Sequence, residues 1–162
     1  MICSYRLSKY WDAALTESSP QTRTWTSFSD VGTLTNLEEY SIVEDMFITA
    51  IVSICRALGA ASLTVRELEI VQGAACNFHE GQVVDLEHAG EIARQILREL
   101  AWAKLTSDQC EVHFGYDYYV YIVSYGKQLD AALQLGKGLR LEPFISPYFS
   151  INNQYVDITI RE

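Results

Sequence analysis

Two segments with helical periodicity, separated by segments that alternate with a period of two, constrain the fold of this chain most. From Leu37 to Leu58, apolar residues recur at steps of three and four, while polar and acidic residues occupy the other side. Thr35-Asn-Leu-Glu38 has the pattern of a capping box, and Gly59 that of a helix stop. A helix with one apolar stripe has to bury it against another element.

A second amphipathic helix is predicted to follow Asp85, its expected N-cap. Its apolar stripe consists of Leu86, Ala89, Ala93, Ile96, Leu97 and Leu100. Residues 127–135 predict a shorter helix that is closed by Gly136 and Gly138.

Six segments in which apolar and polar residues alternate are predicted to be strands. The predicted strands are 2–10, 62–71 with a bulge between Val65 and Leu68, 110–115, 118–124, 139–145 with Pro143 at an edge, and 155–160. The middle two form a hairpin that turns at 115–117, because a single strand of that length would be unusually long. We therefore predict one α+β domain over residues 1–162, with a mixed sheet and the two main helices on one face. The second face of the sheet is expected to be partly open.

Charge favours a protein partner over nucleic acid or membrane. The formal net charge is −9, from 21 acidic and 12 basic residues, and between residues 24 and 93 acids outnumber bases by eleven to two. Such a field repels phosphate backbones and anionic membrane surfaces, and it attracts a basic protein. Plain solubility is the competing explanation, since acidic surfaces provide that as well.

Cysteine spacing and apolar runs indicate a cytoplasmic protein. The four cysteines are far apart, form no C-x-x-C pair and lie in apolar surroundings, which is typical of free thiols in a reducing compartment. The N-terminus lacks the pattern of a signal peptide. The longest apolar run, residues 46–55, is shorter than the roughly 20 residues that span a bilayer.

No catalytic, cofactor or metal signature is present. The histidines at 79, 88 and 113 form no H-E-x-x-H motif, and the glycines of residues 135–140 lack the spacing of a phosphate loop. No G-x-S-x-G is found either. A small hydrolase-like enzyme that uses His113 and Asp117 remains one alternative, although these two residues also suit a polar cross-strand pair.

Tyrosines cluster in the hairpin, at positions 116, 118, 119, 121 and 125. Aromatic residues on a sheet stack nucleic-acid bases when lysine and arginine accompany them, but Asp108, Glu111 and Asp117 are closer here than Lys104 or Lys127. Tyrosine and tryptophan are also common anchors of protein interfaces. Burial in the core accounts for part of the set, and a self-complementary, homo-oligomeric face is a further alternative.

Six blocks of sequence together resemble a family of small acidic bacterial proteins. The blocks are YRLSKY at 5–10, TWTSFSDVG at 24–32, LEEYSIVEDMFITAI at 37–51, EGQ at 80–82, ILRELAWAKL at 96–105 and VHFGYDYYVYI at 112–122. The family is that of immunity proteins associated with polymorphic toxins, often of the Rhs or contact-delivered type. The resemblance covers residues 5–148, and the tail 151–162 extends beyond it.

The resemblance implies a non-enzymatic inhibitor that binds and occludes a cognate, basic toxin in the cytoplasm, without a cofactor and with at most a weak homodimer. The expected electrostatic contacts are Asp30, Glu38, Glu39, Glu44, Asp45 and Asp117. The expected aromatic anchors are Trp25, Tyr116, Tyr119 and Tyr121. The TWTSFSD stretch has a competing role as the cap of the first helix.

Overall fold

A computed structural model describes residues 1–9, 25–130, 133, 135 and 138–150. Its core element is a seven-stranded sheet in the order β3-β2-β4-β5-β6-β1-β7. The strands are β1 (Ile2–Ser8), β2 (Ser62–Ile70), β3 (Val83–Asp85), β4 (Ala101–Thr106), β5 (Cys110–Phe114), β6 (Val120–Tyr125) and β7 (Arg140–Pro143).

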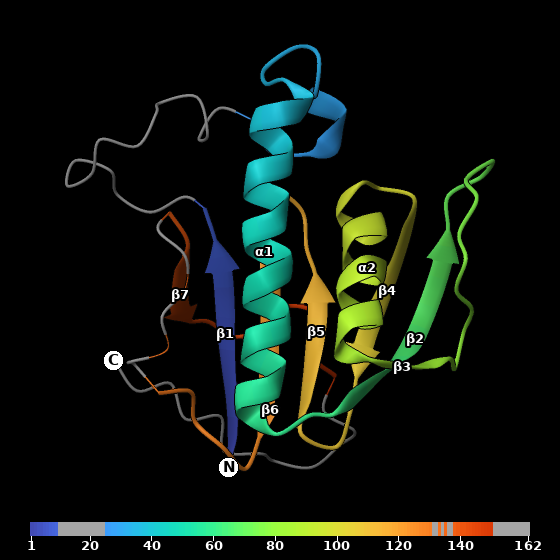
Figure 1. The fold of residues 1–162 in the computed structure, drawn as a ribbon. Coiled ribbons are helices and arrows are strands. Elements are labelled where there is room, and N and C mark those ends of the chain that lie inside the picture. The colour runs from blue at the N-terminus through green and yellow to red at the C-terminus, as the bar shows by residue number, and fades with distance from the viewer. Residues whose placement is uncertain (10–24, 131–132, 134, 136–137, 151–162) are drawn as a thin grey trace.

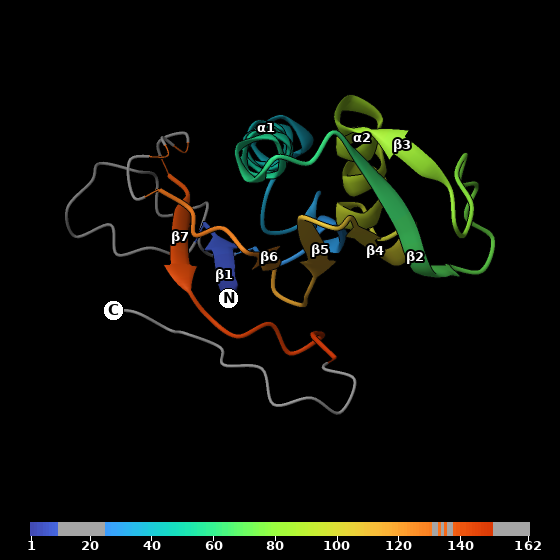
Figure 2. The ribbon, with the colours of Figure 1, turned by 90° about the horizontal axis from the view of Figure 1, so that it is seen from below.

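The α+β class and the placement of both main helices on one face of the sheet are confirmed. Helix α1 (Leu37–Leu58) lies over β1, β6 and β5, and helix α2 (Leu86–Leu97) lies over β4 and β2 (Figures 1 and 2). Every pair of neighbouring strands in this sheet is antiparallel, so the prediction of a mixed sheet is wrong. The short connections within the hairpins allow antiparallel pairing without crossover helices.

The apolar stripes of both helices and the inner face of the sheet form one core. Phe47, Ile51 and Ile54 of α1 are buried against it, as are Val112 and Ile122 of the sheet. Burial of each large apolar side chain contributes about 1.5–3 kcal/mol to the free energy of unfolding.

Helix α1 starts one residue later than the capping-box pattern predicted. Asn36, not Thr35, is the N-cap, and its side-chain oxygen accepts from the backbone N–H of Glu39 at 2.9 Å. Thr35 is buried and donates to the Glu39 carboxylate at 3.3 Å. At the other end Gly59 closes the helix in the left-handed region, as predicted.

Helix α2 begins after its predicted cap, because Asp85 accepts from the backbone N–H of His88 at 2.8 Å. It ends at Leu97, three residues before Leu100, which was predicted to continue its stripe. The chain then turns through Glu99, whose φ is 63°, into strand β4. No strand was predicted at 101–106, but this segment is β4, a central strand of the sheet.

The remaining strand predictions agree with the structure. The register of β2 against β4 shifts between Arg66 and Glu69, at the predicted bulge. Strands β5 and β6 form the predicted hairpin, and Pro143 ends the edge strand β7. Residues 127–130, predicted to begin a short helix, are not helical. The strand predicted at 155–160 lies outside the described residues.

The second face of the sheet is covered in part, which agrees with the expectation of a partly open face. After β7 the chain passes beneath β1, β6 and β5, on the side opposite the helices (Figure 2). Its start is held by Ser4, whose carbonyl accepts from Phe144 N at 3.0 Å and whose Oγ accepts from Ser146 N at 3.0 Å. We call residues 144–150 the strap.

Candidate functional site

A groove of about 790 Å³ opens at one end of the molecule. It lies where β2, α2 and β5 end and β4 begins, at the top of Figure 1. Its lining is largely apolar and includes Ile70 and Val71, which are about half exposed. A concave, mostly apolar site with a few polar groups is the usual form of a binding pocket.

Three carboxylates and five aromatic residues line this groove, and two of the five, Phe114 and Tyr118, are buried. The carboxylates belong to Glu69, Glu99 and Asp117, all exposed, and the other aromatic residues are Trp102, Tyr116 and Tyr148. Tyr116 is 85% exposed, and Trp102 packs against Tyr148 at a centroid distance of 5.7 Å. Among the lining residues that the structure describes there is no lysine, arginine or histidine. The groove is therefore electronegative.

The backbone that shapes the groove is unusual at three lining residues. Glu99, Asp117 and Tyr118 have φ values of 63°, 57° and 62°, in the left-handed region that few non-glycine residues adopt. The backbone of the turn also lies close to the ring of Tyr121. A Cβ added at Gly115 would lie only 2.7 Å from Tyr121 Cε2. This close approach explains why glycine occupies position 115.

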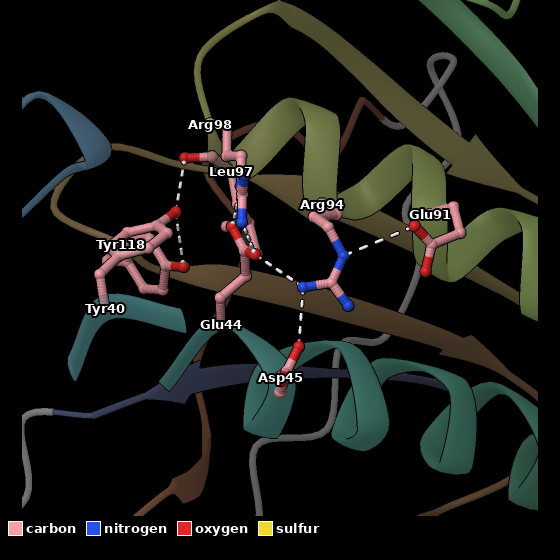
Figure 3. Close-up of polar contacts among 8 residues, drawn as sticks. All are labelled: Tyr40, Glu44, Asp45, Glu91, Arg94, Leu97, Arg98 and Tyr118. Atoms are coloured by element: carbon pink, nitrogen blue, oxygen red, sulfur yellow. Dashed lines mark hydrogen bonds and ion pairs between the residues drawn. The ribbon is translucent and has the colours of Figure 1, made fainter. Parts of the chain in front are cut away.

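Hydrogen bonds behind the groove fix the positions of its rings. Tyr118 donates to the hydroxyl of Tyr40 at 3.0 Å, and Tyr40 donates to the carbonyl of Leu97 at 3.2 Å (Figure 3). Burial raises the pKa of both phenols, so both remain protonated donors. Trp102 donates its indole N–H to the Phe114 carbonyl at 2.8 Å. The turn 115–118, the end of α2 and the start of β4 are thus connected.

An ion-pair network lies next to these tyrosines and joins α1 to α2 (Figure 3). Glu44 is fully buried and accepts two hydrogen bonds from Arg98, both 2.8 Å, and one from Arg94 at 2.6 Å. The hydrogen bonds to Glu44 raise the pKa of Arg98. Burial alone would lower the pKa of Arg94, but Asp45 and Glu44 raise it. All these charges are compensated within the fold.

A serine, a histidine and a glutamate form a hydrogen-bonded row beneath the sheet. His113 Nδ1 lies 2.7 Å from Ser146 Oγ, and its Nε2 lies 2.7 Å from Glu111 Oε2. Glu111 also accepts from the Tyr125 hydroxyl at 2.5 Å. Burial alone would raise the pKa of Glu111, but the hydrogen bonds from His113 and Tyr125 hold it below its ordinary value.

These residue types also form hydrolytic triads, but the row is enclosed. His113 is 0% exposed and Ser146 is 2% exposed, so a substrate carbonyl has no path to the hydroxyl. Ser146 Oγ additionally accepts from the backbone N–H of Tyr148 at 3.3 Å. In the described part of the chain, His113 makes no hydrogen bond with Asp117, its predicted catalytic partner, which lies exposed in the groove. The row fastens the strap to the sheet.

Three of the predicted partner-binding residues are buried, which corrects the expectation that they are surface contacts. Trp25 is 0% exposed and packs 4.9 Å from Tyr118. Glu44 is enclosed in its ion pairs. Tyr121 is 6% exposed because Tyr148 of the strap covers it, with ring centroids 6.0 Å apart.

The other seven predicted residues reach the surface to different degrees. Four are exposed: Glu38, Asp45, Tyr116 and Asp117. Asp30, Glu39 and Tyr119 are half-buried and have local partners. The carboxylate of Asp30 accepts from the backbone of Thr26 at 2.7 Å, and Asp45 pairs with Arg94. The short 3-10 helix Phe28–Asp30 and the first turn of α1, which contains Glu38 and Glu39, nevertheless lie at the same end of the molecule as the groove (Figure 1).

Glu69, Glu99, Trp102 and Tyr148 line the groove and were not predicted. Trp102 had a detectable signal, because it alternates with the small apolar residues of β4. Tyr148 follows the strand predicted at 139–145 and belongs to an aromatic stretch, PFISPYF. Glu69 and Glu99 had no detectable signal in the sequence, since nothing local distinguishes them from other surface acids.

The thiols of Cys55 and Cys110 lie next to each other in the core. All four thiols are free, and those of Cys3, Cys55 and Cys110 are buried. Over the described ranges, no three His, Cys, Asp or Glu side chains gather as metal ligands. Neither helix in those ranges combines the length and apolarity required to cross a bilayer.

No family model, curated protein or solved structure matches this chain.

Proposed function

We propose that this chain is an immunity protein that binds a cationic toxin protein in the cytoplasm and neutralises it by occlusion, without catalysis. The observation that carries the proposal is the groove. Among its described lining residues are the exposed Tyr116 and three exposed carboxylates, and none of these residues is basic. The resemblance of residues 5–148 to immunity proteins supplies the class of partner.

Charge supports this assignment in two ways. The net charge of −9 attracts a basic partner over distances near the Debye length, which raises the association rate. At short range, carboxylates at the rim select against acidic or neutral partners. Glu38 and Glu39 at the start of α1 extend the acidic surface beyond the groove at the same end (Figure 1).

The proposal is tested with the product of the neighbouring reading frame. If that frame encodes a basic toxin domain, co-expression of this chain should restore growth, and titration calorimetry should give one saturable complex. A neighbouring product without toxicity, or a toxin that shows no binding at micromolar concentrations, would contradict the proposal.

The Ser146–His113–Glu111 row favours a second candidate function, that of a hydrolase. Its enclosure argues against this function. A fluorophosphonate probe that labels Ser146 in the folded protein would support the hydrolase, and absence of labelling favours the binding protein.

A further inference from the structure

We infer that the groove receives an arginine side chain of the partner protein, with the guanidinium beside the aromatic side chains of Trp102, Tyr116 and Tyr148 and near the carboxylates of Glu69 and Glu99. The inference rests on the proposed function for the identity of the partner, but not for the chemistry of the site.

The first argument is charge complementarity. Three carboxylates surround a largely apolar groove, and the lining residues that the structure describes include no cation. Binding of a second acidic group there would be repulsive, whereas a cation reduces the mutual repulsion of the carboxylates. The preferred occupant is therefore positively charged.

The second argument is the combination of rings with carboxylates. Aromatic faces attract a cation, and arginine makes such contacts more often than lysine because its planar guanidinium also stacks. The three methylenes of the arginine side chain can pack against apolar side chains that line the groove, such as Ile70 and Val71. A carboxylate at the rim then accepts hydrogen bonds from the guanidinium edge, in pairs.

The third argument comes from how this molecule holds its own arginines. Arg6 lies 4.1 Å from the ring centroid of Phe144, and its Nε donates to Glu142 at 3.0 Å. Arg98 lies 5.4 Å from the ring of Phe28 and donates to Glu44. Arg6 also lies 4.6 Å from the ring centroid of Tyr119, so both internal sites combine aromatic rings with a carboxylate, and the groove contains the same kinds of group.

The rigidity of the groove supports a preformed site. The indole of Trp102 is fixed by its hydrogen bond to Phe114, and Tyr118 is fixed through Tyr40. Groups that are already ordered lose little conformational entropy when a ligand arrives. Tyr116 is the most exposed of the lining aromatic residues, so its ring is the most accessible to a ligand.

The test is a titration of the ¹⁵N-labelled full chain with the capped tripeptide acetyl-Gly-Arg-Gly-amide at neutral pH, followed by NMR. The indole N–H signal of Trp102, assigned with Trp102→Phe, should shift and saturate with a dissociation constant on the order of 1 mM. The peptide with citrulline, which is neutral and nearly isosteric, should bind at least about tenfold more weakly. Equal binding of the citrulline peptide would overturn the inference.

Variants localise the effect to the groove. Glu69→Gln with Glu99→Gln should abolish saturation while the melting temperature stays unchanged. A matched double variant, Glu87→Gln with Asp108→Asn, removes the same charge at the opposite end of the molecule and should leave binding intact (Figure 1). If both double variants lose binding equally, the effect is net charge and the groove assignment fails.

Other occupants give distinct outcomes. A lysine tripeptide that binds as well as the arginine peptide would overturn the choice of guanidinium. If Arg161→Gln shifts the NMR signals of the groove residues in the absence of peptide, the occupant is an arginine of this chain itself. That result would also overturn the inference.

The inference and the proposed function fail separately. If the arginine peptide binds in the groove but the chain has no affinity for the neighbouring toxin, the groove assignment stands and the proposed function fails. If the toxin binds the Glu69→Gln, Glu99→Gln variant with unchanged affinity, the function stands and the groove assignment fails.

Discussion

Glu44 and Arg98 are joined by two hydrogen bonds of 2.8 Å each, one from Nε and one from Nη2, although Glu44 is completely buried. This pair connects α1 to α2 directly behind the tyrosines that support the groove (Figure 3). Neutralising only one member of a buried pair leaves the other without its partner, which is more costly than removing both.

We expect Glu44→Ala to lower the free energy of unfolding by about 2–4 kcal/mol, because Arg94 and Arg98 lose a shared carboxylate that water replaces only partly. Chemical denaturation measures this change. Asp45→Ala is the matched control, since Asp45 also pairs with Arg94 but is exposed, and its cost should be below about 1 kcal/mol. Equal costs for the two variants would contradict the assignment.

Lys9 predicts a dependence of stability on alkaline pH. Burial lowers the pKa of Lys9 to about 8, an effect that Asp30 partly opposes, and its ammonium donates to the Trp25 carbonyl at 2.6 Å. Between that value and 10.5, the ordinary pKa of a lysine, the unfolded chain binds more protons than the folded one. The free energy of unfolding should therefore rise by about 1–2 kcal/mol from about pH 7.5 to 9.5.

Urea denaturation at these two pH values measures the rise, and Lys9→Met should remove it. A wild-type protein whose stability stays constant or falls over this window would contradict the lowered pKa. The measurements should stay below about pH 10. Burial raises the pKa of Tyr40 and Tyr118, so above the ordinary pKa of a phenol the free energy of unfolding of the protein falls.

The row beneath the sheet predicts sensitivity to acid. The folded pKa of Glu111 is lowered, so its contribution to stability is complete above the ordinary value of 4.5 and is lost as the pH falls through the folded pKa. Glu111→Gln should be less stable at about pH 6 but should lose less stability between about pH 6 and 3.5. Glu91→Gln, an exposed acid, serves as the control. Parallel pH profiles for the wild type and Glu111→Gln would refute this role.

Ser146 is predicted to be structural. We expect Ser146→Ala to cost about 1–2 kcal/mol, because His113 Nδ1 and the Tyr148 N–H each lose a hydrogen-bond partner in a buried site. Affinity for the partner protein should change less than about threefold. Loss of a hydrolytic activity together with unchanged stability would instead identify Ser146 as a nucleophile.

Much of this fold could be predicted from local sequence patterns, because the apolar residues of helices and strands recur with a characteristic period. Helix α1, its glycine stop and the bulge in β2 were all predicted. Strand β4 was not, since Leu100 extends the helical stripe of α2 and Ala101 and Ala103 carry little strand signal. The break is made by Glu99, whose left-handed backbone no local pattern indicates.

The candidate site was harder to predict because its residues meet through long-range contacts. Glu44 and Asp45 are adjacent acids, but only Glu44 is buried, by arginines 50 and 54 residues later in the chain. Tyr121 was expected to be an exposed anchor, and it is covered by a strap more than twenty residues away. Tyr116 and Asp117, at the tip of a predicted turn, were placed correctly at the surface because a turn tip has nothing to cover it.

The central claim is that the groove end of the molecule is the surface that a cationic partner protein contacts. Its most direct test is the association rate constant with the neighbouring toxin, measured by stopped flow over a range of salt concentrations. For Glu69→Gln, Glu99→Gln, Asp117→Asn, we predict a rate at least about tenfold lower at low salt and a weaker salt dependence than for the wild type. A triple variant that associates as fast as the wild type, with the same salt dependence, would contradict the account.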